Sequence, residues 1–221
     1  ATRARVSSLG NSPHLTDTQN VYSNPADMFA LGGDYATIET GKTVATSTTD
    51  GTEGMVVRSM GDSKMGLSLG HDSDVSMTLR TAAAAAFPSK VNYNQQNPIE
   101  LSYGMKAGDM AWAGTLVYSK YQSKTGINEK EDSLGARFGM NMGPMKFFAG
   151  LGLADNYEND TDGKYKGTSA ISAGFEYQMD TMFFDVGVAT AGFKTDTAAG
   201  TETSKFTGTT IDAKVTSVHK K

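Results

Sequence analysis

Residues 133–193 carry the most regular pattern of hydrophobic and polar positions in the chain. Apolar side chains recur at every second position, and glycines or polar residues fill the positions between them. Successive side chains of a β-strand point to opposite faces, so this period of two predicts strands with one oily face and one small or polar face. The pattern predicts four antiparallel strands in a row, at 134–142, 145–153, 171–179 and 182–188.

The same alternation predicts strands on both sides of this region. The clearest hairpin runs over 99–105 and 110–121, and its second strand of about twelve residues would measure about 40 Å, or near 28 Å across a membrane when tilted. Shorter candidates lie at 35–40, 55–60, 65–69 and 75–79, and a last strand at 206–218. The five alanines at 82–86 fit either a brief helix or an alanine-rich strand end.

The predicted connections alternate strictly between short and long. Short turns follow Met105, Met142 and Met179, whereas 122–132, 155–167 and 194–204 are polar and predicted to be long loops. All the short turns then lie at one end, as in bacterial outer-membrane barrels, although lipocalin-like barrels share this asymmetry. In a soluble sheet the oily face would be the core, and in a membrane barrel it would face lipid.

Together these features predict an all-β fold. We expect an antiparallel transmembrane β-barrel or barrel-like wall of roughly eight to ten strands, with short turns at one end and long loops at the other. Residues 1–221 are expected to form a single domain, in which 1–33 are an extended and short-helix segment and 34–218 hold the strands.

Composition narrows the class of protein. Hydrophobic content is 38% with 25 Gly and 5 Pro, which suits a barrel whose lipid-facing residues are diluted by alternation. No run of about 18 apolar residues occurs, so no transmembrane helix is expected. The net charge of -4 and the lack of a basic patch give no reason to expect a nucleic-acid partner. The absence of cysteine is compatible with an oxidising compartment.

The first 33 residues contain one short motif. Residues 1–21 lack a clean period and predict an extended segment. Asn24 is a suitable cap for a short helix that has Pro25 at its first position, and Gly32 and Gly33 would end it.

Residues 17–26, Asp-Thr-Gln-Asn-Val-Tyr-Ser-Asn-Pro-Ala, together with Arg3-Ala4-Arg5-Val6-Ser7-Ser8-Leu9-Gly10, resemble a known family. The resemblance is to porin-like outer-membrane proteins of predatory, Bdellovibrio-type bacteria; fatty-acid transporter barrels share only the Asn-Pro-Ala piece. It implies a homo-oligomer whose subunits enclose a shared chamber that can hold lipid, in the outer membrane of a Gram-negative cell. The start at Ala1-Thr2-Arg3, without a hydrophobic leader, is what we expect once a signal peptide has been cut behind a small residue; an ordinary cytoplasmic chain is the alternative.

The predicted faces assign the candidate site residues. Lipid-facing positions are Phe138, Met140, Phe147, Leu151, Ile171, Phe175, Phe184 and Val186. Tyr103, Trp112 and Tyr177 lie near the short turns and predict an interfacial girdle, or else a hydrophobic plug at one end of a soluble barrel. Arg137, Lys146, Glu176 and Asp185 would point inward, where they line water or only neutralise one another.

No pattern indicates catalysis. His14, His71 and His219 are scattered, with no second ligand at metal spacing, and no serine nucleophile motif is present. We therefore expect no enzyme, no cofactor and no metal. The sequence predicts a porin-like or structural homo-oligomer able to enclose lipid, with membrane lipid and further copies as partners. Two alternatives stay open: a soluble or periplasmic β-barrel that binds a small apolar ligand, and a monomeric diffusion porin.

Overall fold

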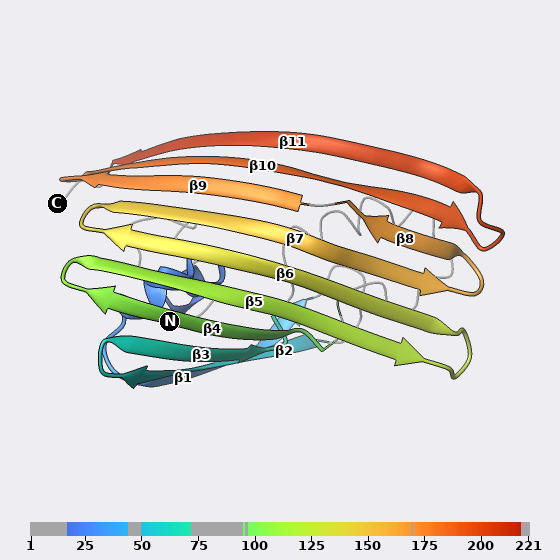
Figure 1. Cartoon of the computed structure of the whole chain (residues 1–221), viewed down its shortest axis with the longest axis horizontal. Helices are drawn as coiled ribbons and strands as arrows, with labels where there is room; N and C mark the ends of the chain where they lie inside the picture. Colours follow the sequence, from blue (N-terminus) through green and yellow to red (C-terminus); the bar gives the residue numbers. More distant parts are fainter. Residues whose placement is uncertain (1–16, 44–49, 72–94, 96, 169, 218–221) are drawn as a thin grey trace.

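The computed structural model describes residues 17–43, 50–71, 95, 97–168 and 170–217. They form one antiparallel sheet of eleven strands, which gives a curved wall (Figure 1). The strands are β1 (Tyr35–Thr43), β2 (Asp50–Met60), β3 (Ser63–Leu69), β4 (Ile99–Ala107), β5 (Met110–Ser123), β6 (Glu129–Met142), β7 (Met145–Asn159), β8 (Gly163–Gly167), β9 (Ala170–Met179), β10 (Met182–Thr197) and β11 (Glu202–Ser217).

Strands that follow one another in the chain are neighbours in the sheet, apart from one shared position. Both β8 and β9 lie between β7 and β10: β8 pairs with their polar ends and β9 with their apolar ends. The eleven strands therefore occupy ten places, and the prediction of an all-β antiparallel wall is confirmed. The order ends at β1 on one side and at β11 on the other.

The tight turns all lie at one end of the wall, at the left of Figure 1. They are the two-residue connections 61–62, 108–109, 143–144 and 180–181. Gly61, Gly108, Gly143 and Asp180 adopt positive φ angles of 65°, 60°, 55° and 53° there. Two-residue hairpin turns demand this left-handed backbone, which glycine and aspartate tolerate best.

The three long loops predicted at the opposite end, 122–132, 155–167 and 194–204, are wrong. The polar stretches continue the strands, and the connections shrink to 124–128, 160–162 and 198–201. Glu131, Tyr157 and Tyr165 are buried on one face there, while Lys130 and Glu158 are on the other. The alternation persists, but with polar residues on both faces, so hydropathy alone did not distinguish these strand ends from loops.

Other boundaries also differ from the predicted ones. β1 and β2 are longer than 35–40 and 55–60, and β11 spans Glu202–Ser217. Residues 18–22 form the 3-10 helix η1 (Thr18–Tyr22) instead of an extended segment. The predicted short helix is confirmed as the 3-10 helix η2 (Pro25–Phe29), capped by Asn24. The predicted features at 1–16, 75–79, 82–86 and 218 lie outside the described residues.

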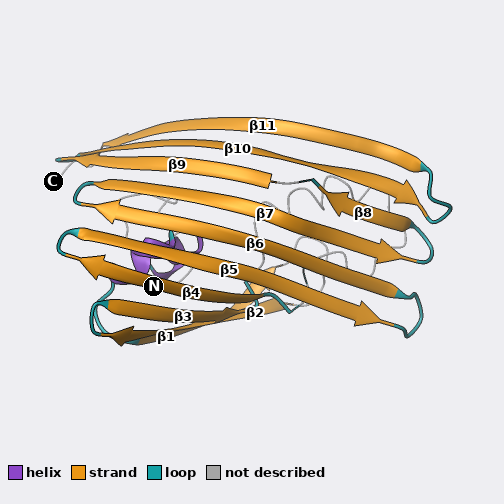
Figure 2. Ribbon diagram, in the orientation of Figure 1, coloured by secondary structure: helices purple, strands orange, loops and turns teal. Residues whose placement is uncertain are grey.

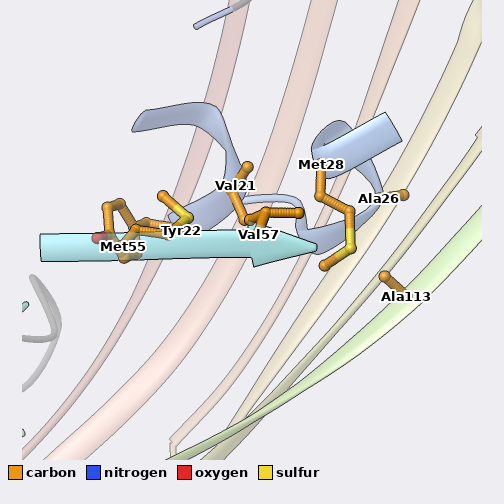
Figure 3. Close-up of a cluster of buried hydrophobic side chains, with 7 residues drawn as sticks. All are labelled: Val21, Tyr22, Ala26, Met28, Met55, Val57 and Ala113. Atoms are coloured by element: carbon orange, nitrogen blue, oxygen red, sulfur yellow. The ribbon is translucent and has the colours of Figure 1, made fainter. Parts of the chain in front are cut away.

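The small core forms where η1 and η2 pack against the wall; we call the face they cover the inner face. Both helical turns lie against one side of the sheet in Figure 2. Figure 3 shows Val21, Tyr22 and Met28 reaching from this segment toward β2, with Ala113 of β5 nearby. Val57 and Met55 of β2 are 1% and 2% exposed there, so the inner face at β2 is sealed by the N-terminal segment.

Candidate functional site

The outer face, opposite η1 and η2, carries the apolar rows. The strand register places all eight predicted lipid-facing residues on this face. Phe138, Leu151, Ile171 and Val186 are 47–52% exposed. The others are partly covered by their neighbours: the rings of Phe147 and Phe175 lie 4.9 Å apart.

This apolar surface has a defined height. On β6 the outer residues run from Met142 to Leu134, and Asp132 and Lys130 follow on the same face. The nine positions span about 30 Å along the strand, or about 23 Å at the tilt of about 40° usual in barrels, close to their apolar band. Beyond it, Glu158 of β7 pairs with Lys130 and Lys164 at 3.3 and 3.2 Å.

The predicted girdle residues lie on the outer face near the tight turns. The rings of Tyr103 and Trp112 meet edge to face at 6.5 Å, and Ser63 and the Tyr103 hydroxyl are 3.2 Å apart. Tyr177 stacks on Phe184 with centroids 6.4 Å apart. Trp112 and Tyr177 lie two positions from the turn ends of their strands and Tyr103 lies four, so all three are near the same end of the wall.

On the inner face, one row of polar residues crosses five neighbouring strands. Cross-strand partners place Asn141, Lys146, Glu176, Asp185 and Lys214 side by side, one on each of β6, β7, β9, β10 and β11. We call this set the inner belt. It brings three of the four predicted inward charges together, and Lys146 Nζ lies 3.8 Å from Glu176 Oε2.

Arg137, the fourth predicted charge, belongs to a separate ion pair. It lies on the inner face of β6 and pairs with Glu100 of β4, whose side chain is 2% exposed. Arg137 is thus neutralised by a buried carboxylate that the sequence analysis did not single out. The only sequence signal for Glu100 is its position: it is a charged residue between Ile99 and Leu101, on the inward side of a strand whose apolar residues alternate.

The Asn-Pro-Ala motif attaches the N-terminal segment to the inner belt. The Asn24 side chain accepts a hydrogen bond from Ala26 N at 3.1 Å and donates one to Asn141 Oδ1 at 2.8 Å. Asn141 in turn donates to Asp27 Oδ1 at 2.8 Å, and Lys146 Nζ lies 3.0 Å from the same oxygen. The sequence analysis did not identify Asp27 and Asn141 as site residues, because neither lies in a recognisable motif for this contact.

Lys64 makes a second attachment. Its Nζ donates to the backbone carbonyls of Met28, Leu31 and Gly33 at 3.0, 2.6 and 3.1 Å. The ammonium group therefore binds one carbonyl in the last turn of η2 and two carbonyls that come after this helix. An inward lysine of β3 is the only sequence signal for this role.

Two glycines make room for η2 on the wall. A β-carbon on Gly139 would lie 1.9 Å from Asn24 Oδ1 and 2.9 Å from Ala26 N. One on Gly104 would lie 2.9 Å from the Phe29 ring. At these two positions the small residues of the inner face serve the close approach of the protein's own N-terminal segment.

The third attachment surrounds Glu53, which is directly opposite Glu39 in the β1–β2 pair. Gln19 Nε2 donates to both carboxylates, at 2.9 and 2.7 Å, and His71 Nδ1 lies 3.1 Å from Glu53 Oε2. The ring of His71 stacks on Tyr22 at 3.6 Å. Burial raises the pKa of Tyr22 to about 12.

The described residues contain no group of three or more His, Cys, Asp or Glu side chains arranged to hold a metal ion. Within the same ranges, no helix is both long enough and apolar enough to cross a membrane.

Comparison with known proteins gives only distant structural likeness. No family model matches the sequence, and no curated protein matches it. Among solved structures, the wall is similar to in-vitro folded OmpT, an outer membrane protein of Vibrio cholerae, with a TM-score of 0.46 and 12% identity over 83% of this chain. A trimer form of OmpT gives 0.41 and 14% over 74% of the chain, and a loop L8 deletion mutant gives 0.43 and 13% over 74%. The chain spans 60%, 55% and 58% of these structures, respectively.

Proposed function

We propose that this chain is a porin-like structural subunit of a bacterial outer membrane, which assembles with further copies into a homo-oligomer able to enclose lipid. The role is architectural and involves no catalysis. The observation that carries the proposal is the apolar band of the outer face, which is bounded by tight turns and aromatic residues at one end and by charged residues at the other.

The exposure of this band supports contact with lipid. Twenty-four large hydrophobic side chains are exposed among the described residues, all but Phe206 on the outer face, and those on neighbouring strands form continuous rows. Monomeric soluble proteins rarely expose a continuous apolar surface of this kind. The inner face, which a soluble barrel would fill with an apolar core, instead carries buried charged side chains such as Glu53, Glu100 and Glu131 beside small residues, and it packs against η1 and η2 over part of its area.

The two ends of the strand order support assembly from several copies. In the described part of the chain, β1 pairs only with β2, and β11 only with β10. Ile38 and Ile211, on these edge strands, are each 77% exposed. Backbone groups inside a bilayer need hydrogen-bond partners within protein, because lipid supplies none. Strands of neighbouring copies would supply these partners.

The part of the inner face that η2 does not cover favours a chamber that holds lipid as well as water. η2 packs on β4, β5 and β6. The inner residues of the strands that follow include Gly150, Gly152, Gly174, Gly187 and Ala189. In the part of the chain that the structure describes, few charged side chains outside the inner belt face this space, so its walls suit lipid chains as well as water.

The test is the mass of the detergent-extracted protein, measured with its bound lipid by native mass spectrometry. The proposal expects a mass of several subunits and phospholipid that stays bound after exhaustive washing. A monomer with large, steady single-channel conductance would instead indicate a diffusion porin. Extraction without detergent would indicate the soluble barrel.

A further inference from the structure

The two edge strands of the wall run in opposite directions. β1 starts near the tight turns, where Tyr35 is opposite Val57, and runs away from them. β11 ends at the tight turns, where Ser217 is opposite Met182. The two strands lie along the lower and upper edges of the wall in Figure 1. When two copies stand side by side with their tight turns on the same side of a membrane, β11 of one copy is therefore antiparallel to β1 of the next.

The outer faces of the two edge strands also match. Counted from the tight-turn end, each strand carries an alanine, an isoleucine and a threonine in this order. They are Ala36, Ile38 and Thr40 on β1, and Ala213, Ile211 and Thr209 on β11. Both isoleucines are 77% exposed, so the chain itself leaves them largely uncovered.

This match selects one register for a pair between copies. With Ile38 opposite Ile211, the two alanines are opposite each other, and so are the two threonines. A shift by one residue would put the apolar side chains on opposite faces of the sheet. A shift by two toward the tight turns would place Glu39 opposite Asp212 on the inner face, and like charges directly opposite are destabilising. The reverse shift would place Ile38 opposite Thr209.

The same register puts the tight turns of the two copies at one level. Continuing the β1–β2 register places Gly32 opposite Met60, the last residue before the turn at 61–62. Ser217 is opposite Met182, the first residue after the turn at 180–181. Pairing Ile38 with Ile211 brings Gly32 of one copy opposite Ser217 of the other. The apolar bands of neighbouring copies therefore start at the same depth.

We propose that the copies assemble by antiparallel pairing of β11 of one copy with β1 of the next, with Ile38 opposite Ile211. The pairing rests on the homo-oligomer proposed above and identifies its interface. It supplies the outward backbone groups of both edge strands with hydrogen-bond partners that lipid cannot provide. Because each contact joins two different edges, every further copy adds in the same way, and a closed ring leaves no free edge.

Disulfide cross-linking tests this register on a clean background, because the chain contains no cysteine. Ile38→Cys and Ile211→Cys are made in separate chains, which are co-expressed with different tags and oxidised in detergent. Dimers linked by a disulfide should contain one chain of each kind, since Cα atoms of opposite residues in an antiparallel pair are within disulfide range. Ala36→Cys with Ala213→Cys is a second pair, which guards against one variant failing to fold.

The matched controls combine Ile38→Cys with Thr207→Cys or Val215→Cys. These positions lie on the same face of β11, four residues to either side of Ile211. The offset of roughly 13 Å exceeds the reach of a disulfide, so these pairs should give about tenfold less dimer or lower still. More dimer with either control than with Ile211→Cys would overturn the register.

Three further outcomes would overturn the pairing. One is a dimer formed by Ile38→Cys alone, which would join two like edges. Another is a disulfide within a single chain that carries both Ile38→Cys and Ile211→Cys, which would show that the wall closes on itself. The third is an oligomer in native mass spectrometry in which neither cysteine pair links, and this result would leave the proposed assembly standing. A monomer in that measurement would overturn both the pairing and the proposed assembly.

Discussion

At the scale of single residues, the inner face is organised by the contacts that hold η1 and η2. Asn24, Asp27 and Gln19 bind polar side chains of the wall, and Lys64 binds the carbonyls at the end of η2. Inward polar groups on β1, β2, β3, β6 and β7 therefore bind the protein's own N-terminal segment.

Asp27 should be the most important of these contacts. Its side chain is 3% exposed, and Asp27→Ala leaves Lys146 and Asn141 without their shared partner. Because Lys146 is 23% exposed and water reaches it, we expect a loss of about 1–3 kcal/mol of unfolding free energy, below the cost of breaking a fully buried pair. Urea unfolding in detergent measures the loss. Asp160→Ala, at an exposed turn, is the control, and an equal effect of both variants would contradict the assignment.

Gly139 tests the close approach of η2. Gly139→Ala puts a β-carbon against Asn24 and the backbone of Ala26, so η2 must shift, at a cost of about 1–3 kcal/mol. Gly114→Ala is the matched control on neighbouring β5, where the nearest atom, Arg137 O, is 3.7 Å away. Thermal unfolding of the two variants should separate them; similar midpoints would show that η2 does not press on Gly139.

Tyr22 should give the protein a pH dependence above pH 10. Burial raises the pKa of this phenol from 10.0 to about 12, so the unfolded chain ionises first as the pH rises. Its contribution is complete below pH 10 and falls by about 1 kcal/mol by pH 11. Urea midpoints between pH 8 and 11 measure this slope, which Tyr22→Phe should reduce. An unchanged slope in that variant would assign the dependence to other groups.

At the scale of the elements, the strands at the end opposite the tight turns extend well past the apolar band. β6, β7, β10 and β11 have 14, 15, 16 and 16 residues, whereas 9–11 residues cross a membrane. The extra length carries charged residues on the outer face and buried polar residues such as Glu129 and Asn159 on the inner one. We expect these ends to form a rigid rim outside the hydrocarbon.

Proteolysis tests the rim. Lys124 lies in the exposed connection 124–128, whereas Lys130 and Lys164 are exposed residues within paired strands. Trypsin should cut after Lys124 and spare the other two, because a paired strand cannot enter the protease as an extended segment. Mass analysis of the fragments identifies the sites. Early cleavage after Lys130 or Lys164 would instead support the long loops that were predicted from the sequence at these positions.

The sequence was informative wherever hydropathy alternates and uninformative wherever both faces are polar. The strands from Leu134 to Val188, the tight turns and the cap at Asn24 could be predicted because local rules determine them. The strand ends near Glu131 and Tyr165 could not, because their partners are other polar strand ends. Likewise, the pairing of Lys146 with Asp27 joins residues 119 positions apart, and no local signal links them.

At the scale of the whole molecule, the wall has an apolar outer face and an inner face of small and polar residues, with an edge strand at each end of its order. The cost of a charged side chain on the outer face should therefore depend on its depth in the bilayer. Phe138→Arg, in the middle of the band, should cost about 2–4 kcal/mol of stability in a bilayer, whereas Asn156→Arg, on the outer face beyond it, should cost about 0–1 kcal/mol. Unfolding from liposomes measures both, and equal costs would argue against a bilayer around Phe138.

The most direct test of the account is the accessibility of spin labels on the protein in liposomes. Labels at Phe138 and Ile211, on the outer face within the band, should collide with dissolved oxygen. A label at Lys130, on the outer face beyond the band, should collide with a water-soluble nickel complex. Equal nickel accessibility at Phe138 and Lys130 would contradict the claim that the outer face of the wall meets lipid.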